Sequence, residues 1–201
     1  MRDTLEKMKS GKFILIIGAM GSGKSSLMKR VISLHPELIV PYSYTTRARR
    51  ADHIENDHYK FLSVEEFKSK IDTGDFLEWA EFGGNFYGTL KSEVMDYLGA
   101  GKILLKEMEV QGVRQVRDIL PKNELITVFI HAGPWKALKR RALAREAMDE
   151  AQIEKRRLRY EDEITFMSEA DVIIANTDGG QEVANEAFES LIQSVMKPAT
   201  T

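Results

Sequence analysis

One junction decides the fold: the chain passes from the apolar run Phe13-Ile14-Leu15-Ile16-Ile17 directly into Gly18-Ala19-Met20-Gly21-Ser22-Gly23-Lys24-Ser25-Ser26. The apolar run has the length of a buried strand, and the residues that follow Gly23 have the pattern of a helix. Gly18 and Gly23-Lys24-Ser25 then have the spacing of a phosphate-binding loop in its proper context. Its glycines let backbone N–H groups surround phosphates, Lys24 bridges phosphate oxygens, and the Ser25 hydroxyl ligates Mg²⁺. We therefore predict that residues 18–26 bind the phosphates of a nucleotide.

Short apolar runs recur along the chain between longer helical patterns. Strands are predicted at Phe13–Ile17, Lys102–Leu105, Leu125–Ile130 and Asp171–Ala175. Helices are predicted at Lys24–Leu34, Ser92–Gly99, Val110–Ile119, Trp135–Arg145, Ile153–Ser168 and Glu182–Met196. Apolar strands that alternate with helices indicate a parallel sheet covered on both faces. The expected fold class is α/β, with a P-loop NTPase-type parallel sheet flanked by helices.

The stretch 38–89 breaks this alternation. It contains short aromatic and β-branched pieces separated by turn signals, and one helix start at Ser63. Ser63 and Glu66 have the spacing of a capping box, which fixes that start. We expect a small, mostly β insertion at 38–89 on a nucleotide-binding core made of residues 1–37 and 90–201.

Composition and charge argue against several classes of function. The 201 residues include 29 basic and 31 acidic side chains, so net charge does not attract the protein to nucleic acid or to an anionic membrane. The chain has no cysteine, which fits a reducing compartment, and residues 1–12 lack the apolar core of a signal peptide. No run approaches the ~20 apolar residues of a membrane span. We expect a cytoplasmic protein without nucleic-acid or membrane partners; the sequence leaves monomer or homo-oligomer open.

The phosphate-binding loop does not by itself determine how the nucleotide is used. A GTPase usually carries Asn-Lys-x-Asp on a late strand, whereas this chain reads Asn176-Thr177-Asp178-Gly179 there. The missing lysine weakens a switch function. Two uses of the nucleotide are left: transfer of a phosphoryl group to an acceptor, and binding without a reaction.

The insertion contains the side chains that an acceptor phosphate needs. Arginines and tyrosines recur in the segments 43–50, 57–59 and 84–89. A guanidinium group pairs with two phosphate oxygens at once, so these residues suit a phosphate monoester. From composition alone, a solvated run of arginines explains the same residues.

Taken together, these motifs resemble those of guanylate kinase, one of the P-loop nucleoside monophosphate kinases. The similarity extends from about Phe13 to Ile192 and rests on the loop and, in order, on Ser43-Tyr44-Thr45-Thr46-Arg47, Phe76-Leu77-Glu78-Trp79-Ala80-Glu81, Gly84-Asn85-Phe86-Tyr87-Gly88-Thr89 and Val110-Gln111-Gly112-Val113-Arg114. It implies transfer of the ATP γ-phosphoryl group to GMP, and to dGMP, with Mg²⁺. It also implies a GMP-binding insertion and a helical lid at about 140–158. Two alternatives remain: an inactive binding module of the same fold, and a kinase for a phosphorylated sugar.

The resemblance assigns the acceptor site residue by residue. It places the GMP phosphate on Arg47, Arg50, Tyr59 and Tyr87, and the guanine base on Ser43, Glu78 and Thr89, with Gly88 beside them. The chemistry agrees, because guanine presents an N1–H and an N2 amine that one carboxylate accepts together. Adenine has an acceptor at N1, so it would leave Glu78 unpaired. A solvent-facing strand glutamate is the alternative for Glu78, and Trp79 is expected to pack in the core.

The resemblance also names donor-side and lid residues. Arg141 and Arg156 are implied as catalytic with Lys24, Arg145 lies at the lid's edge or over the adenine, and Asn176 lies near the adenine. Glu107 would contact the GMP ribose and, with Ser25, the metal or its water. A solvated helix face is the alternative for Arg156, and we favour it for Arg157 and Arg159. A plain strand-end turn is the alternative for Asn176 and Asp178.

Several positions depart from the family pattern. Ala144-Arg145-Glu146-Ala147 stands where relatives commonly have Gly-Arg-Gly-Thr, which predicts a more helical and stiffer lid. Glu107 and Glu109 replace a pair of aspartates, and each adds one methylene to the reach of its carboxylate. Met20 and Tyr44 have no role that the sequence explains.

Overall fold

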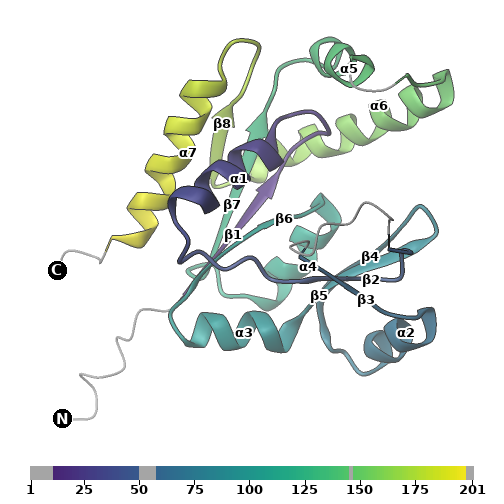
Figure 1. Ribbon diagram of the computed structural model, residues 1–201, viewed down its shortest axis with the longest axis vertical. Coiled ribbons are helices and arrows are strands. Elements are labelled where there is room, and N and C mark those ends of the chain that lie inside the picture. The colour runs from purple at the N-terminus through teal and green to yellow at the C-terminus, as the bar shows by residue number, and fades with distance from the viewer. Residues whose placement is uncertain (1–10, 50–57, 145–146, 198–201) are drawn as a thin grey trace. The chain divides into compact units, whose positions relative to one another are not determined.

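The computed structural model describes residues 11–49, 58–144 and 147–197, in which strands and helices alternate (Figure 1). The strands are β1 (Lys12–Ile17), β2 (Ser43–Thr45), β3 (Tyr59–Phe61), β4 (Phe76–Phe82), β5 (Asn85–Leu90), β6 (Ile103–Glu107), β7 (Leu125–His131) and β8 (Val172–Ala175). The helices are α1 (Lys24–Leu34), α2 (Val64–Asp72), α3 (Lys91–Gly99), α4 (Val110–Ile119), α5 (Trp135–Leu143), α6 (Glu150–Thr165), the 3₁₀-helix η1 (Phe166–Glu169) and α7 (Gln181–Met196). The predicted α/β fold class is confirmed.

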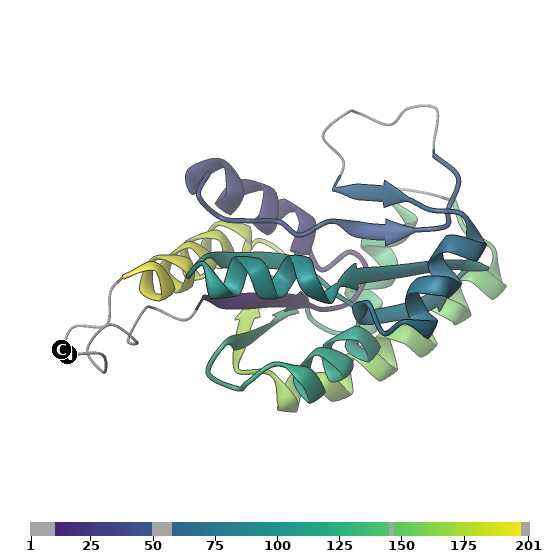
Figure 2. The same cartoon turned by 90° about the horizontal axis from the view of Figure 1, so that it is seen from below.

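Four strands form the sheet that leads into the phosphate loop, in the order β6-β1-β7-β8. β7 and β8 run parallel, with Val128 opposite Val172. The residues of β1 from Phe13 to Ile17 are all apolar, and each is at most 1% exposed. Helices α1 and α7 pack against each other, as both views show (Figures 1 and 2). Burial on both faces explains why the strands of this sheet are nearly continuous apolar runs.

A second, smaller sheet has the order β3-β2-β5-β4. β2 and β3 are parallel, whereas β5 is antiparallel to both β2 and β4. Phe67 of α2 is fully buried and stacks on Phe76 of β4, with the ring centroids 4.3 Å apart. Ser63 and Glu66 form the predicted capping box, with each side chain bonded to the other's backbone N–H. The small sheet therefore has its own aromatic core, closed by α2.

The chain divides into two compact units. The first takes in the described residues of Met1–Phe13, Leu38–Lys106 and Gln111–Leu125, and it contains the smaller sheet. The second takes in those of Ile14–Glu37, Glu107–Val110 and Ile126–Thr201, and it contains the phosphate loop, α5 and α6. These are units of packing, so the functional boundaries drawn at residues 38–89 stay a prediction.

The segment between α5 and α6 differs from its prediction. The helix expected to reach Arg145 ends at Leu143, and the next begins at Glu150 instead of Ile153. Asp149 causes this start, because its side chain accepts from the Gln152 backbone at 2.7 Å in a second capping box. Ala144 and Ala147 are not helical, so the expectation of a more helical lid at residues 144–147 is wrong for these two; Arg145 and Glu146 lie outside the described residues.

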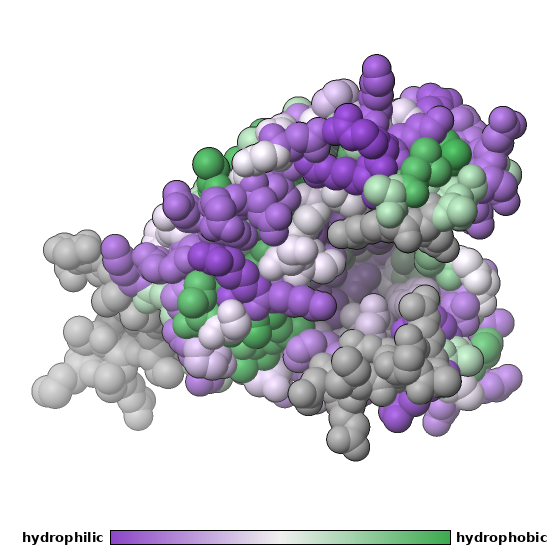
Figure 3. Space-filling model, turned by 45° about the horizontal axis from the view of Figure 1, so that its top comes forward, coloured by the Kyte–Doolittle hydropathy of each residue, from purple (hydrophilic) through white to green (hydrophobic). Residues whose placement is uncertain are grey.

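Hydrophilic side chains cover most of the face seen in Figure 3, where apolar side chains form separate patches. The large apolar residues that the described ranges do expose include Met20, Leu158, Ile173 and Val183. None of the helices described is both long enough and apolar enough to cross a membrane.

Candidate functional site

The phosphate loop connects β1 to α1 in the second unit. Gly18, Gly21 and Gly23 all have positive φ angles, of 145°, 84° and 91°. A Cβ atom at Gly18 would lie 2.6 Å from the carbonyl oxygen of Ile130, so glycine alone fits there. Within the loop, the Ser22 N–H donates to the Ala19 carbonyl at 3.0 Å. The loop is therefore a strongly curved backbone segment that leads into the first turn of a helix.

Lys24 is the first residue of α1, and its side chain turns back over the loop. Its ammonium donates to the Gly18 carbonyl and, at 3.2 Å, to the Ala19 carbonyl. Ser25 and Ser26 are exposed in the same helical turn, whose backbone N–H groups carry partial positive charge. The Ser22 hydroxyl is buried without a hydrogen-bond partner in the described part of the chain. This donor-rich environment suits phosphate oxygens; nothing in it explains Met20, which is exposed.

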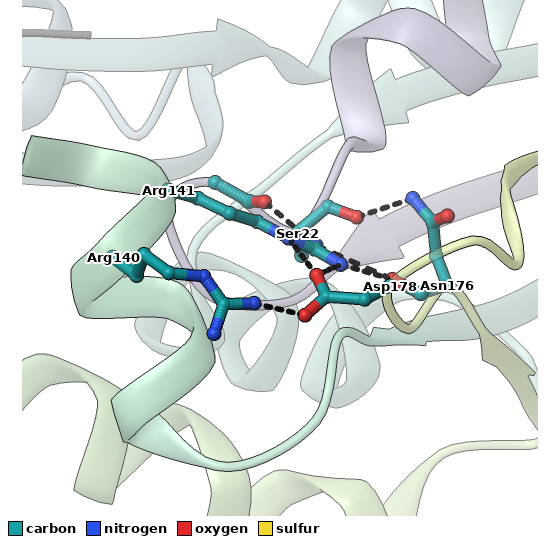
Figure 4. A network of polar contacts seen from close by, with 6 residues as sticks. Ser22, Arg140, Arg141, Asn176 and Asp178 are labelled. Carbon is teal, nitrogen blue, oxygen red and sulfur yellow. Dashed lines mark hydrogen bonds and ion pairs between the residues drawn. The ribbon is translucent and has the colours of Figure 1, made fainter. Parts of the chain in front are cut away.

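A network of polar contacts links α5 to the loop (Figure 4). Arg141 donates to Asp178 Oδ1 from Nε at 3.0 Å and from Nη2 at 2.8 Å, and it reaches the Asn176 carbonyl at 3.2 Å and the Gly21 carbonyl at 3.4 Å. Arg140 contacts the other carboxylate oxygen of Asp178. The hydrogen bond from Arg141 is the largest cause of a lowered pKa at Asp178, which lies on the surface. Asp178 therefore holds the predicted catalytic arginine beside the loop.

Asn176 has a clear structural role at the end of β8. It is 7% exposed, and its Nδ2 donates to the Ser22 carbonyl at 2.7 Å. Its backbone N–H donates to the His131 carbonyl, also at 2.7 Å. The Asn176 amide thus holds the loop in place through the Ser22 carbonyl. This role agrees with the alternative of a strand-end turn, and the contact of Asn176 with adenine stays a prediction.

The arginines of α6 divide into two groups. Arg157 pairs with Glu154 at 2.8 Å and with Glu161 along the exposed helix surface, as favoured for it from the sequence. Arg156 is half-buried and is already engaged in an interaction within the described chain. Its predicted catalytic role stays a prediction, as does that of Arg145, which lies outside the described residues.

Glu163 of α6 belongs to the electrostatic environment of the loop. Burial raises its pKa to about 7, the negative charge of Glu109 adds to the shift, and the positive charge of Lys24 opposes it. A carboxyl group near Lys24 makes the local charge depend on protonation near neutral pH. Sequence reasoning did not single out Glu163, since its position beside Lys24 follows from how α6 packs.

The predicted metal ligands are few. Ser25 is exposed in α1, and Glu107 is half-buried at the end of β6. Among the described residues there is no group of three or more His, Cys, Asp or Glu that could hold a metal ion. Mg²⁺ commonly keeps several waters and is bound through substrate phosphates with one or two protein groups. Ser25 and Glu107 are therefore compatible with a metal that arrives with a nucleotide.

In the first unit, Arg47 follows β2 and is half-buried. Its backbone N–H donates to Thr45 Oγ1 at 3.1 Å, and its guanidinium carbon lies 5.4 Å from the ring centroid of Tyr59. The Arg47 Nε is buried and has no hydrogen-bond partner among the residues described. A buried guanidinium N–H in this state favours an anionic ligand. Arg50, the second predicted phosphate arginine, lies outside the described residues.

The strand register brings several predicted acceptor residues onto one sheet. Ser43 pairs with Tyr59 between β2 and β3, and Thr45 pairs with Tyr87 between β2 and β5. At Gly88 a Cβ atom would lie 2.8 Å from the Phe76 ring, so tight strand packing already requires this glycine. The sheet thus places Ser43, Tyr59 and Tyr87 on neighbouring strands close in register. Packing against Phe76 is sufficient to explain the glycine at position 88, so its contact with the base stays a prediction.

Glu78 and Thr89 lie opposite each other in the antiparallel pair of β4 and β5. The Thr89 hydroxyl donates to Glu78 Oε1 at 2.5 Å. Glu78 is 8% exposed and Thr89 is fully buried, which excludes the solvent-facing glutamate. Burial raises the pKa of Glu78, while the Thr89 hydrogen bond and the charge of Lys106 oppose that shift.

Lys106 is a buried lysine near the end of β6. It is 6% exposed, and its Nζ donates to the Pro41 carbonyl at 3.1 Å and to the Tyr42 carbonyl at 3.0 Å. Burial lowers its pKa to about 8, and the charges of Glu78 and Glu93 oppose the shift. The first unit therefore contains a buried lysine and a buried glutamate that interact.

The residues next to Glu78 are fixed by packing and by α4. Trp79 packs against the aromatic cluster of Tyr44, Phe67 and Phe76, so the expectation of core packing is confirmed. Tyr44 also accepts a hydrogen bond from Lys60 Nζ at 3.1 Å, a role that the sequence did not indicate. The Gln115 side chain accepts from the Trp79 N–H at 3.1 Å and donates to the Trp79 carbonyl at 2.9 Å.

Sequence reasoning missed Lys106, Gln115, Glu163 and the anchoring role of Asp178. Only Lys106 left a local signal, since a single charge interrupts the apolar residues of Ile103-Leu104-Leu105 before the strand ends. The other three act on partners at least 36 positions away in the chain, such as Gln115 on Trp79. Their roles follow from tertiary packing.

Comparisons with known proteins give consistent results. The family model for guanylate kinase matches residues 10–195. Guanylate kinase of Synechococcus elongatus is 40% identical over 93% of this chain and 100% of that protein, and guanylate kinase of Malacoplasma penetrans is 36% identical over 96% and 98%. The crystal structure of guanylate kinase from Anaplasma phagocytophilum has the same fold, with a TM-score of 0.70 and 24% identity, over 94% of this chain and 88% of that one.

Proposed function

The chain belongs to the guanylate kinase family, and on this premise we propose that it transfers the γ-phosphoryl group of ATP to GMP, giving ADP and GDP. The single observation that carries the choice of acceptor is the buried pair of Glu78 and Thr89. A carboxylate with one oxygen held by a hydroxyl is suited to accept the N1–H and N2–H donors of guanine.

The donor side of the proposal rests on the phosphate loop. ATP is assigned to the loop residues 18–26, where Lys24 and the first turn of α1 supply positive charge. Mg²⁺ is assigned to the ATP phosphates with Ser25 as its protein ligand and Glu107 near its water, and when bound it neutralises phosphate charge. Asn176 and Arg145 are proposed to contact the adenosine part.

The acceptor side of the proposal rests on the first unit. The GMP phosphate is assigned to Arg47, Arg50, Tyr59 and Tyr87. The buried Nε–H of Arg47, which has no hydrogen-bond partner among the described residues, supports this assignment. The base is assigned to Ser43, Glu78 and Thr89, with Gly88 beside them, and the ribose to Glu107. Adenine would place its N1 acceptor against the Glu78 carboxylate, so AMP is rejected by mismatch.

Transfer itself needs alignment and charge neutralisation more than covalent help, because the GMP phosphate is already an anionic nucleophile. Lys24 is proposed to stabilise the transferring group from the loop. Arg141 and Arg156 are proposed to stabilise the charge that spreads over its oxygens. The hydrogen bonds that Arg141 donates to Asp178 keep its guanidinium close to the loop before any substrate binds.

A coupled assay of ADP release with GMP, dGMP, AMP, CMP and UMP as acceptors tests the proposal. We expect turnover with GMP and dGMP and at least about 10³-fold lower kcat/KM with AMP, as a mismatch at a buried polar site gives. Equal turnover with AMP would contradict the assignment of the base to Glu78. An inactive binding module would bind GMP without ADP release; the presence of Lys24 and Ser25 speaks against it. A cytoplasmic location, where ATP and GMP would both be available, is part of the same proposal.

A further inference from the structure

Lys106 has no role in the proposed binding of ATP or GMP, although it is a buried charged residue. Lysine is almost never fully buried unless it is paired, because its charge loses hydration. Here the residue is 6% exposed, and its ammonium donates to two backbone carbonyls, those of Pro41 and Tyr42. Two carbonyl oxygens satisfy two of its three donors but do not neutralise its charge.

The charges around Lys106 come from two other elements of the first unit. Glu78 of β4 and Glu93 of α3 both interact with it electrostatically. Glu93 Oε2 is buried without a hydrogen-bond partner in the part of the chain that is described, and Glu93 also acts on Lys60 of β3. Lys106 thus interacts electrostatically with two acidic side chains, the buried Glu78 and the half-buried Glu93.

Lys106 also connects the separate residues to which the guanine base is assigned. Its bonds to Pro41 and Tyr42 fix the backbone that enters β2, whose first residue is Ser43. Its charge acts on Glu78, which in turn holds the Thr89 hydroxyl. The Lys106 ammonium group therefore acts on two strands. It bonds the backbone that leads into β2, and its charge acts on the Glu78 carboxylate of β4.

We propose that Lys106 is a positioning residue for base selection: it fixes the entry to β2 and keeps Glu78 an ionised acceptor for the donor edge of guanine. This inference rests on the proposed acceptor, GMP. A neutral Glu78 would present an O–H donor toward the N1–H of guanine, which is the wrong pairing. It would suit the N1 acceptor of adenine instead, so loss of the Lys106 charge weakens GMP binding and improves AMP as a substrate.

Lys106→Met tests the proposal, because methionine keeps most of the length of the side chain and removes the charge. We expect KM for GMP to rise at least about tenfold, which corresponds to about 1.4 kcal/mol, while KM for ATP stays within about twofold. The ratio of kcat/KM for GMP to that for AMP should fall by a similar factor. Lys102→Met, an exposed lysine just before β6, is the matched control and should leave all three values unchanged.

A double-mutant cycle with Glu78→Gln separates positioning from mere support of the fold. If Lys106 acts through Glu78, adding Lys106→Met to Glu78→Gln should change KM for GMP by less than about threefold. This comparison also serves if Lys106→Met alone does not fold, because the double variant leaves no unpaired Glu78 charge. Lys106→Arg keeps the charge and should retain most of the discrimination between GMP and AMP.

The outcomes distinguish the role of Lys106 from the proposed function on which it rests. A wild-type protein that shows no ADP release with GMP would overturn the proposed function. A wild type that prefers GMP, combined with a Lys106→Met variant that keeps this preference, would overturn the role of Lys106 alone. Full additivity in the cycle, with Lys106→Met costing as much in the Glu78→Gln background as in the wild type, would likewise overturn it, since a structural lysine gives that result.

Discussion

The phosphate loop and the Glu78 region, the two places to which we assign ligands, are built from different parts of the chain. The loop is mostly backbone, and its shape follows from glycines such as Gly18 that no other residue can replace. The Glu78 region is made of buried side chains: the Thr89 hydroxyl bonds the Glu78 carboxylate, and the charge of Lys106 acts on it. A site made of backbone groups can therefore be recognised from a local sequence motif. A site made of buried side chains depends on contacts with residues that lie far away in the sequence.

The difference also separates what each region should control. The loop is proposed to act on the transferring phosphoryl group, so its variants should lower kcat. The Glu78 region is proposed to select the acceptor, so its variants should raise KM for GMP. Substitutions in each region test this separation.

Lys24→Ala should have the largest effect. We expect kcat to fall by about 10³-fold, because Lys24 supplies the positive charge over the loop, while the Kd for GMP changes less than about threefold. Steady-state assays and equilibrium GMP binding measure the two quantities. Lys29→Ala, an exposed lysine of the same helix, is the control. Loss of GMP binding together with kcat would break the separation between the two regions.

Arg141→Met should rank second, with kcat about 10²-fold lower. Its guanidinium is held by Asp178, Asn176 and Gly21, so the change removes a preplaced charge beside the loop. The control is Arg157→Met on α6, whose ion pairs with Glu154 and Glu161 are on the surface. That variant should keep at least about half of the activity, as exposed pairs contribute little. Equal losses in the two variants would contradict the proposed difference between Arg141 at the loop and Arg157 on the surface.

Glu78→Gln should raise KM for GMP by about 30-fold, as expected when a charged acceptor is replaced by a neutral amide at a buried site. The value of kcat at saturating GMP should change less than KM. Glu81→Gln on the exposed end of the same strand is the control and should leave both constants unchanged. A fall in kcat with KM preserved would place Glu78 in the transfer step and not in base recognition.

Glu163→Gln should have the smallest effect, and on stability. Burial raises the pKa of Glu163 from 4.5 to about 7 in the folded protein. The folded chain therefore retains this proton where the unfolded chain has lost it, and stability declines as pH rises from about 4.5 through 7. We expect the variant to be more stable than wild type by about 2 kcal/mol at about pH 8, with little difference at about pH 4. Urea denaturation at both pH values measures this; a difference independent of pH would contradict it.

The sequence predicted the fold well where local patterns determine structure. The strand and loop from Phe13 to Lys24 and the capping box of Ser63 are read from neighbouring residues, and both are present. The start of α6 was wrong because the cap at Asp149, with Gln152 in place of the more familiar glutamate, was overlooked. Boundaries depend on single caps, whereas the alternation of elements depends on many residues.

Residues of the candidate site that belong to motifs were predicted from the sequence, whereas the residues that act on them were not. Ser43, Glu78 and Thr89 were named from motifs, and the structure places Glu78 and Thr89 in contact. Lys106 was not named, although it acts on Glu78, because it lies 28 positions further along the chain than Glu78. Neither periodicity nor composition indicates which strand will bring a charge to a given carboxylate. That information exists only in the packed structure.

The two hydrogen bonds between the Gln115 side chain and the Trp79 backbone also bear on how the protein meets other molecules. β4 is the last strand of its sheet, and such a strand ordinarily offers its free N–H and C=O groups to a strand of another molecule. The Gln115 amide binds both groups of Trp79, as a neighbouring strand would. The protein's own helix thereby blocks strand addition at the residue next to Glu78, which protects an aromatic hairpin from intermolecular aggregation.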